Sequence, residues 1–513
     1  QIIQLELELL MFQISEDKLC QRLAILIRIQ QIMLLLLMEF GMYIHILLVK
    51  TLLLAILIVG FLLLERVNNL MKKRFYFLIL IISFSCVKAD LDFNPTTGIS
   101  DGVLDLVQTF GGSKNDVAQS VVATSDGGFA IVGYTQSMDG DVSGKTNESF
   151  DFWVLKFNSQ ATLEWNKTYG GSGDDRGSDI IQTSDGGLAI LGYTDSSDGD
   201  VTNNNGFRDF WLAKLDPLGN LSWQKSFGFS GADQGTTLIE TSDNHFLISG
   251  VLDVTSSGGL GNLGRFSAEH AGGDYWSIKV SSSGDLVWSR FYGGSFTDSP
   301  TGIIENENNE FLFVGGSDSN DVDITNNKGA YDFWVVKSET GGNMVWEKSF
   351  GGSEIDEARG ISATDDGNYI IVGDSRSNDQ NVSLNKGAAD LWMIKVSDDG
   401  ELIWNRSIGG SNFDVSRSIN KTLDNGFIIA GSSRSSDGDV AKNQGQNDAW
   451  IVKINNNGQL LWETTVGGSE IDFAYDAVQL ANGTIIAVGE TSSSNGDITE
   501  NKGFTDLLII KLN

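Results

Sequence analysis

The sequence predicts an all-β fold built from seven repeated units. All twelve tryptophans form six pairs, and the members of each pair are twelve residues apart. A Gly-Gly-Ser motif, Gly-Phe-Ser in the third unit, recurs at spacings of 59, 58, 65, 58, 58 and 58 residues. A period of this kind is typical of repeat architectures. The pairs are Trp153/Trp165, Trp211/Trp223, Trp276/Trp288, Trp334/Trp346, Trp392/Trp404 and Trp450/Trp462.

Each unit is predicted to contain four short strands. The first follows Gly-Gly-Ser, the second carries a recurrent glycine, the third carries Asp-aromatic-Trp, and the fourth carries the second Trp. Runs rich in β-formers, such as 129–132, alternate with turn clusters, such as 455–458. Sixty glycines, three prolines and no helical periodicity after residue 100 argue against helix. Radial repetition of such units predicts a seven-bladed β-propeller with four antiparallel strands per blade.

The two ends of the repeat region complete one another. The seventh unit has Leu508 in the first tryptophan position and ends five residues later. Aligning 104–113 with 163–172 places Leu106 in the position of Trp165. We therefore expect residues 104–110 to form the outer strand of a blade whose other strands come from about 471–513, with Leu106 and Leu508 packed together. Such closure would leave no open sheet edge.

The region before the propeller has a different composition. Met71 begins a basic segment, an apolar stretch follows, and Cys86 comes after small residues, which predicts a secretory signal over 71–86. Its end is similar to a bacterial lipobox, and that resemblance implies lipidation of Cys86. Residues 87–103 are then a linker, and 104–513 are the propeller. We expect the real start to be Met71 and interpret 1–70 as an upstream mistranslation or assembly artefact; the alternative is a genuine membrane anchor that includes 47–64.

Charge and cysteine usage limit the partners and the compartment. The formal net charge is −32, which argues against nucleic acid and against direct binding to anionic membranes. We expect a monomer that meets a membrane only through a lipid anchor. Cys20 and Cys86 are the only cysteines, so the propeller has neither a disulfide nor a Cys-ligated metal. The expected location is the outer membrane or cell surface, otherwise the periplasm or the medium.

Residues repeated in every unit are predicted to be structural. The paired tryptophans suit packing between blades, since each buried aromatic removes a large area from water. An aspartate recurs three residues after each Gly-Gly-Ser and is expected to accept turn N–H groups. A lysine recurs in each third strand and is expected to bury its stem while its ammonium group finds a partner.

The segments between the second and third strands carry a second acidic pattern, Asp-x-Asp. Alternating carboxylates in Gly/Asn-rich loops can ligate calcium, and Asp198 to Asp209 spans twelve residues, as in a calcium loop. However, the sixth position lacks glycine, and 379–381 loses the pattern. Asx-turns need only the same residues, and we prefer that interpretation. No cofactor is certain, and the candidate calcium ligands are Asp139, Asp141, Asp198, Asp200, Asp321, Asp323, Asp437, Asp439 and Asp497.

The same segment is seven residues longer in the third unit, within 256–273. This stretch contains a mixture of side chains that no equivalent loop offers. Because loops on rigid scaffolds commonly carry binding groups, the predicted ligand-binding residues are Arg265, Phe266, Glu269 and His270.

Two resemblances complete the picture. Trp334 to Trp346 and Trp450 to Trp462 resemble the repeat of quinoprotein-type propellers, in which a turn glycine and a docking tryptophan recur. The whole unit is similar to repeats of about 58 residues in secreted proteins and lipoproteins of the Bacteroidetes type. These resemblances cover residues 104–513 and imply a propeller architecture only.

No sequence motif indicates a catalytic residue. The chain has three histidines and no nucleophile elbow, phosphate loop or His/Cys metal cluster. We therefore predict a non-enzymatic binding or scaffold propeller lipoprotein, with a protein or glycan as its partner. The alternative is a polysaccharide-acting or quinoprotein-like enzyme with its site at the central channel. Unlike polar residues gathered from several blades at the channel mouth would favour the alternative.

Overall fold

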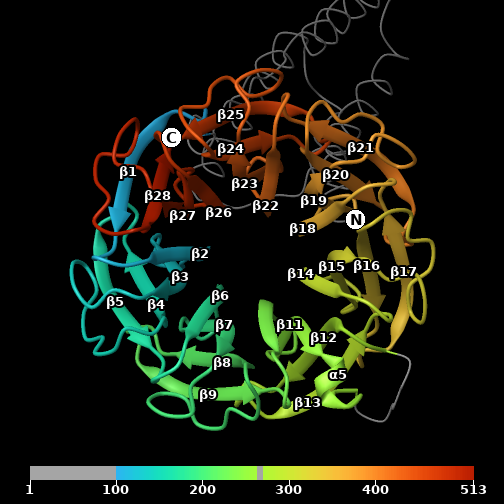
Figure 1. Cartoon of the computed structure of the whole chain (residues 1–513), viewed down its shortest axis with the longest axis horizontal. Helices are drawn as coiled ribbons and strands as arrows, with labels where there is room; N and C mark the ends of the chain where they lie inside the picture. Colours follow the sequence, from blue (N-terminus) through green and yellow to red (C-terminus); the bar gives the residue numbers. More distant parts are fainter. Residues whose placement is uncertain (1–99, 263–269) are drawn as a thin grey trace, which may run out of the picture. The chain divides into compact units, whose positions relative to one another are not determined.

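The computed structural model describes residues 100–262 and 270–513. Seven antiparallel sheets of four strands surround a central opening (Figure 1), so the predicted seven-bladed propeller is confirmed. The described residues contain one short helix, α5 (Val254–Ser257), in the third blade. We number the blades from one to seven in the order of their innermost strands.

The strands occupy equivalent positions in every blade. The innermost strands, which surround the opening, are β2 (Asp116–Ala123), β6 (Asp175–Gln182), β10 (Gln234–Glu240), β14 (Asp298–Glu305), β18 (Asp356–Ala363), β22 (Asp414–Lys421) and β26 (Asp472–Gln479). The second strands are β3 (Phe129–Thr135), β7 (Leu188–Thr194), β11 (Phe246–Asp253), β15 (Phe311–Ser317), β19 (Tyr369–Ser375), β23 (Phe427–Ser433) and β27 (Ile485–Thr491).

The third strands are β4 (Asp151–Phe157), β8 (Asp209–Leu215), β12 (Gly273–Val280), β16 (Asp332–Ser338), β20 (Asp390–Val396), β24 (Asp448–Ile454) and β28 (Asp506–Leu512). The outermost strands are β5 (Leu163–Tyr169), β9 (Leu221–Phe227), β13 (Leu286–Tyr292), β17 (Met344–Phe350), β21 (Leu402–Ile408), β25 (Leu460–Val466) and β1 (Leu104–Phe110).

Ring closure occurs as predicted. β1 pairs antiparallel with β28, and the seventh sheet has the order β1-β28-β27-β26. In Figure 1 the blue strand β1 lies beside the red strand β28. The expectation that Leu106 and Leu508 pack together is wrong, because Leu106 lies opposite Lys511. Since Lys511 is three residues from Leu508 and side chains alternate along a strand, the two leucines face opposite sides of the sheet.

The tryptophan pairs pack blade against blade, as predicted. The first member is fully buried in five pairs, and Trp276 is 4 % exposed. Trp211, for example, meets Phe152 of the preceding blade edge to face, with ring centroids 4.7 Å apart. The second member covers a turn of the following blade: a Cβ on Gly219 would lie only 2.7 Å from the Trp165 ring. The two members of a pair therefore serve opposite faces of their sheet.

Every innermost strand contains a β-bulge at its third or fourth residue. In β2, for example, the register with β3 shifts between Ala118 and Ser120, which leaves Gln119 as the extra residue. The same shift occurs in the other six innermost strands. Bulges of this kind change the direction in which a side chain points, and here all seven occur beside the channel.

Candidate functional site

The aspartate that follows Gly-Gly-Ser binds the turn, as predicted. In all seven units its Oδ2 accepts a hydrogen bond from the backbone N–H of the second motif residue, at 2.7–2.8 Å. The third-strand aspartate of the preceding blade lies close by. A Cβ on Gly111 would approach the carboxylates of both Asp116 and Asp506 to 2.7 Å. The first glycine of the motif therefore makes room for a buried carboxyl pair at each blade boundary.

Burial controls the protonation of these pairs. Desolvation raises the pKa of Asp506 to about 6 and raises that of Asp116. The same cause raises the pKa of Asp298 to about 7, and the neighbouring Asp274 carboxylate raises it further. Two carboxyls that are both buried and close together are most stable when they share a proton.

The third-strand lysines also find partners, as predicted. Lys156 bonds to Asp126 at 2.9 Å and Lys395 to Asp366 at 2.8 Å, with the lysine side chains largely buried. Each of the other five also pairs with a carboxylate. These repeated polar groups are part of the scaffold.

The Asp-x-Asp carboxylates bind backbone amides. Asp198 Oδ1 accepts from the N–H of Ser172 at 2.7 Å, and Asp200 Oδ2 accepts from that of Gly170 at 3.2 Å. Equivalent bonds are made by Asp139, Asp141, Asp321, Asp323, Asp437, Asp439 and Asp497. Among residues 100–262 and 270–513 no three acidic, His or Cys side chains gather as a metal site would require. Calcium binding stays a prediction.

The predicted loop site is only partly described. Arg265, Phe266 and Glu269 lie outside the described residues. His270 contacts Asp274 at 2.6 Å, and its side chain is 5 % exposed. Burial lowers the pKa of His270, but the hydrogen bond and charge of Asp274 outweigh burial, so the pKa is raised. His270 therefore serves as a buried ion-pair partner, which a ligand could not easily reach.

Cys86 and the segments 1–70 and 71–86 also lie outside the described residues. Within the part of the chain that the structure describes, no helix is long and apolar enough to cross a membrane. The lipid anchor and the export signal stay predictions.

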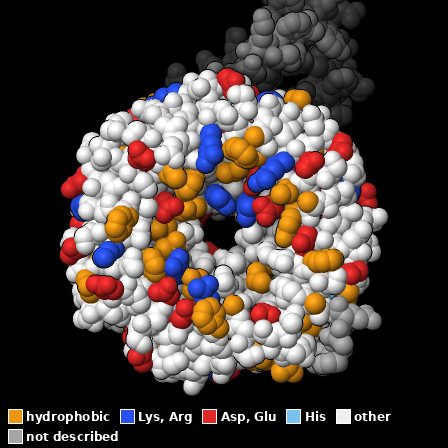
Figure 2. All heavy atoms as spheres, in the orientation of Figure 1, with side chains coloured by type: hydrophobic (Ala, Val, Ile, Leu, Met, Phe, Trp, Pro, Cys, Tyr) orange, Lys and Arg blue, Asp and Glu red, His pale blue; other side chains and the backbone are white. Residues whose placement is uncertain are grey.

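The channel mouth breaks the seven-fold repeat. Three positions per blade surround it: the residue after the recurrent aspartate, the bulged residue, and the residue after the recurrent glycine. The first set is Val117, Arg176, Gln234, Ser299, Glu357, Val415 and Phe473; the second is Gln119, Ser178, Thr236, Thr301, Arg359, Arg417 and Tyr475; the third is Tyr134, Tyr193, Val251, Gly316, Asp374, Ser432 and Glu490. Figure 2 shows basic and acidic side chains gathered around the opening.

In blade five these three positions form one ion network. The Arg359 guanidinium donates to Glu357 at 2.7 Å and lies 3.4 Å from Asp374. Asp374 is only 5 % exposed. Since Arg359 contacts residues from both flanking positions, the three sets share one face of the innermost two strands. Arg359 thereby compensates two carboxylates that burial would otherwise disfavour.

In blade six the bulged position holds a second arginine. Arg417 makes no hydrogen bond or ion pair with any residue that the structure describes. Burial lowers its pKa, and the nearby positive charge of Arg359 lowers it further. A guanidinium presents five N–H donors and stays charged in proteins. Arg417 is therefore a free, partly desolvated cation at the channel mouth.

In blade seven the cluster contains a carboxyl and a phenol. Tyr475 Oη donates to Glu490 Oε1 at 2.7 Å. Burial raises the pKa of Glu490, although the hydrogen bond from Tyr475 and the charge of Arg417 act in the opposite direction. Burial and the charge of Glu490 raise the pKa of Tyr475. Glu490 is thus a carboxyl that retains its proton to higher pH than an exposed glutamate.

Aromatic groups continue this cluster into blades one and two. The Arg176 guanidinium lies 5.0 Å from the ring centre of Tyr134 and 4.0 Å from that of Phe150. Charge–π contacts of this type hold an arginine and an aromatic ring in a fixed geometry. In blades three and four the same positions hold Val, Thr, Ser, Gln and Gly. The mouth is therefore charged and aromatic on one side and small or neutral on the other.

Comparisons with known proteins add the following. No family model matches the chain. It is 26 % identical over 208 residues to the regulatory protein FlaEY of Caulobacter vibrioides, a match that spans 39 % of this chain and 21 % of that protein.

Similar solved structures include several propellers. A putative 6-phosphogluconolactonase from Bacteroides fragilis is 12 % identical with a TM-score of 0.39, and the match covers 72 % of this chain and 91 % of that one. A gluconolactonase from Xanthomonas campestris is 9 % identical with a TM-score of 0.34, covering 81 % and 97 %. A PQQ-bound aldose sugar dehydrogenase from Streptomyces coelicolor is 9 % identical with a TM-score of 0.35, covering 81 % and 100 %. These are likenesses of fold.

The prediction that this chain is not an enzyme is overturned. It assumed that no blade differs from the others at a potential site, whereas Arg417, Tyr475 and Glu490 form a distinct group at the channel mouth. No sequence motif marks this group, because its residues occupy positions whose identity varies from unit to unit.

Proposed function

We propose that the protein is a carbohydrate-acting enzyme that cleaves a glycosidic bond in an acidic sugar polymer at the channel mouth. The observation that carries this proposal is the contact between a buried carboxyl of raised pKa and a phenol, Glu490 and Tyr475, beside the free cation Arg417. Aromatic and charged groups together suit sugars, which present both apolar ring faces and hydroxyls.

Each group has a role in this chemistry. Arg417 binds the carboxylate of a uronic acid, because a guanidinium can form two parallel hydrogen bonds with it. Glu490 gives its proton to the leaving glycosidic oxygen as general acid. Asp374, held by Arg359, accepts a proton from the attacking water. The C–O bond breaks and the water oxygen bonds to the anomeric carbon. The leaving oxygen takes the proton of Glu490, and Asp374 takes a proton of the water.

The experiment is a reducing-sugar assay on purified protein with acidic and neutral polysaccharides. We expect release from a polyuronate and little from a neutral glucan. Glu490→Gln should reduce kcat at least about hundredfold, the scale of general acid catalysis. Glu401→Gln alters an exposed carboxylate on a 3→4 turn and is the matched control. No release from any acidic polymer, or equal activity in both variants, would refute the proposal.

The expected signal over 71–86 supports action outside the cytoplasm, where polymeric sugars occur. We propose that Cys86 carries the lipid anchor. Mass spectrometry of the protein from membranes should find an acylated N-terminal Cys86, and an unmodified mature chain in the medium would contradict this.

A further inference from the structure

Blade three differs from its neighbours at a position that is buried in all the others. Nine residues after the recurrent glycine, six blades carry Val or Ile, and each is at most 7 % exposed. We call these the plug residues: Val142, Val201, Ile324, Val382, Val440 and Ile498. Each belongs to the same hydrophobic cluster as the first-slot Trp, or Leu508, of its own blade. The plug therefore fills the space beside that large side chain.

In blade three the plug position is Gly259. The Asp-x-Asp turn is replaced by α5, which ends at Gly258 in the left-handed conformation. Gly259 also has a positive φ of 78°, a conformation that a branched side chain rarely adopts. The next residue, Leu260, is 57 % exposed and does not take the plug's place. Val254 of α5 is 1 % exposed and packs in the Trp276 cluster, but from a different position in the loop.

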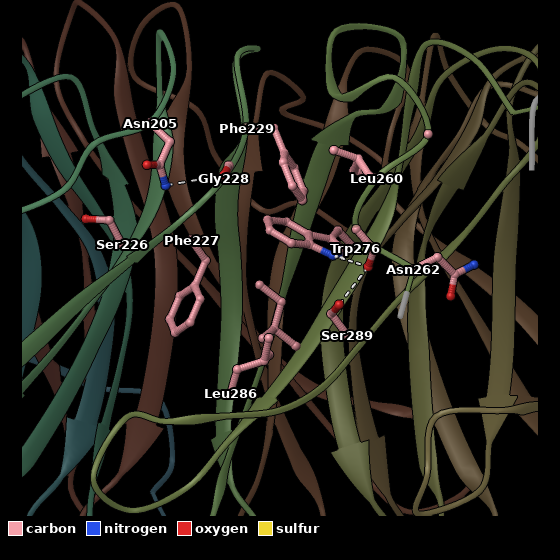
Figure 3. A pocket seen from close by; sticks show the side chains of 13 residues that line it. Asn205, Ser226, Phe227, Gly228, Phe229, Leu260, Asn262, Trp276, Leu286 and Ser289 are labelled. Carbon is pink, nitrogen blue, oxygen red and sulfur yellow. Dashed lines mark hydrogen bonds between the residues drawn. The ribbon is translucent and has the colours of Figure 1, made fainter. Parts of the chain in front are cut away.

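A cavity of about 680 Å³ lies where the plug is missing. It lies between β9 of blade two and β12 and β13 of blade three, and its apolar lining includes Phe227, Phe229 and Trp276. Figure 3 shows Phe229 and Leu260 on one side of the Trp276 indole and Leu286 on the other. This volume is within the range of small-molecule sites.

The tryptophan in the cavity is also bonded differently. In four blades its Nε1 donates to the Asn, Gln or Glu side chain that follows the second Trp, as Trp211 does to Gln224 at 2.9 Å. Blade three has the short Ser289 there, and both Trp276 Nε1 and Ser289 Oγ donate to the Gly261 carbonyl, at 3.0 and 2.7 Å. In blade two Gln224 covers the indole, and blade three has no such side chain at this position. The cavity therefore extends over Ser289.

From this geometry we infer that the blade-three cavity is a binding site for one uncharged, ring-bearing small molecule. The aromatic walls favour a flat apolar face through stacking and area burial. Among the described residues that line the cavity none is charged, so these residues would not compensate a ligand charge for its lost hydration. The inference does not depend on the channel-mouth proposal, because the two sites share no residue.

The experiment uses the full chain and N-phenyl-1-naphthylamine, a neutral dye made of a naphthyl and a phenyl group. We expect dye emission to rise and tryptophan emission to fall, with one dye per chain, because the other six blades are plugged. The negatively charged 8-anilino-1-naphthalenesulfonate should bind at least about tenfold more weakly, since its charge is not compensated. Absence of neutral dye binding, several dyes per chain or equal affinity for both dyes would overturn the inference.

A chimera locates the site. Replacing 251–273 with the blade-four segment 316–331 restores the plug, and dye binding should be lost. Val440→Ala removes methyl groups from a plug in distant blade six, so it should lower the melting temperature and leave dye binding unchanged. If the chimera does not fold, Ser289→Gln, which introduces the blade-two residue, should weaken dye binding at least about tenfold by covering the indole. Unchanged binding in either variant would place the dye elsewhere.

Discussion

The propeller has two polar regions, one with the same residues in every blade and one with different residues from blade to blade. In every blade the same aspartate accepts a turn N–H at the blade boundary, and the same third-strand lysine pairs with a carboxylate. At the channel mouth the three positions of each blade vary among apolar, acidic, basic and aromatic residues, and Arg417 has no partner among the described residues. Residues that recur in every blade therefore serve the fold, whereas positions that vary between blades are the ones that a ligand could use.

The largest expected effect tests the repeated scaffold. Deleting 101–110 removes β1, exposes the edge of β28 and should lower the melting temperature by at least about 10 °C, with aggregation. Calorimetry and light scattering measure both effects. A synthetic peptide of residues 101–113 should restore part of the loss, and an unchanged melting temperature in the deletion would contradict closure by β1.

The next effect tests the unrepeated mouth. Arg417→Gln removes the free cation and should raise KM for an acidic polymer about tenfold or more, because a charge-assisted hydrogen bond is lost. Stability should be unchanged or higher, since a desolvated charge without a partner is removed. A fall in stability with unchanged KM would instead assign Arg417 to the scaffold.

The pH dependence separates the two regions further. Burial raises the folded-state pKa of several boundary aspartates, and raises that of Asp332 and that of Asp390 to about 6. Their contribution to stability is complete below the unfolded pKa near 4 and is lost as pH rises through about 6. The melting temperature should therefore rise between pH 8 and pH 5. Below about pH 4 this gain should reverse, because Asp126 and Asp185, with pKa values near 2, lose their lysine pairs.

Activity should follow pH through Glu490. Because its pKa is raised, the protonated form persists above the range of an exposed glutamate and is lost as pH rises further. kcat/KM should fall on the alkaline side, and this limb should be absent in Glu490→Gln. A limb that survives the substitution would belong to another group.

The smallest effect concerns the Asp-x-Asp loops. Asp198→Ala should cost about 1–3 kcal/mol, because a turn N–H loses its acceptor. Asp198→Asn should cost less, since blade seven has Asn495 at the same place, bonded to the Ser469 N–H at 2.8 Å. If the loops act only through backbone bonding, millimolar calcium should not change this order. A calcium-dependent rise in melting temperature that Asp198→Ala reduces would support the calcium interpretation instead.

The architecture could be predicted from the sequence because the residues that each blade needs recur in all seven units. The four strands, ring closure by 104–110 and the roles of Trp, Asp and Lys all follow from spacing and alternation. The expected packing of Leu106 against Leu508 was wrong. The repeat alignment shows that the two leucines belong to one blade, but it does not show which face of the sheet each occupies.

The candidate site was harder to predict for a physical reason. Arg359, Arg417 and Glu490 come from three consecutive blades and come together only when these blades pack side by side. The bulge that directs the two arginines is a backbone feature without its own residue signature. The blade-three loop was recognised as different, but its informative feature is Gly259, a missing apolar residue, rather than the charged residues near it.

The closing blade contains one further detail, at the seam between the chain ends. Elsewhere a tryptophan from one blade covers a turn glycine of the next, but at the seam Leu106 packs beside Ala161, which takes the place of that glycine in blade one. A strand β1 from a second copy of the chain would present the same leucine to the same alanine, and it could dock only at the edge of β28, because the other six sheets contain their own outer strand. The seam is therefore the place at which two rings could exchange an outer strand and so become linked.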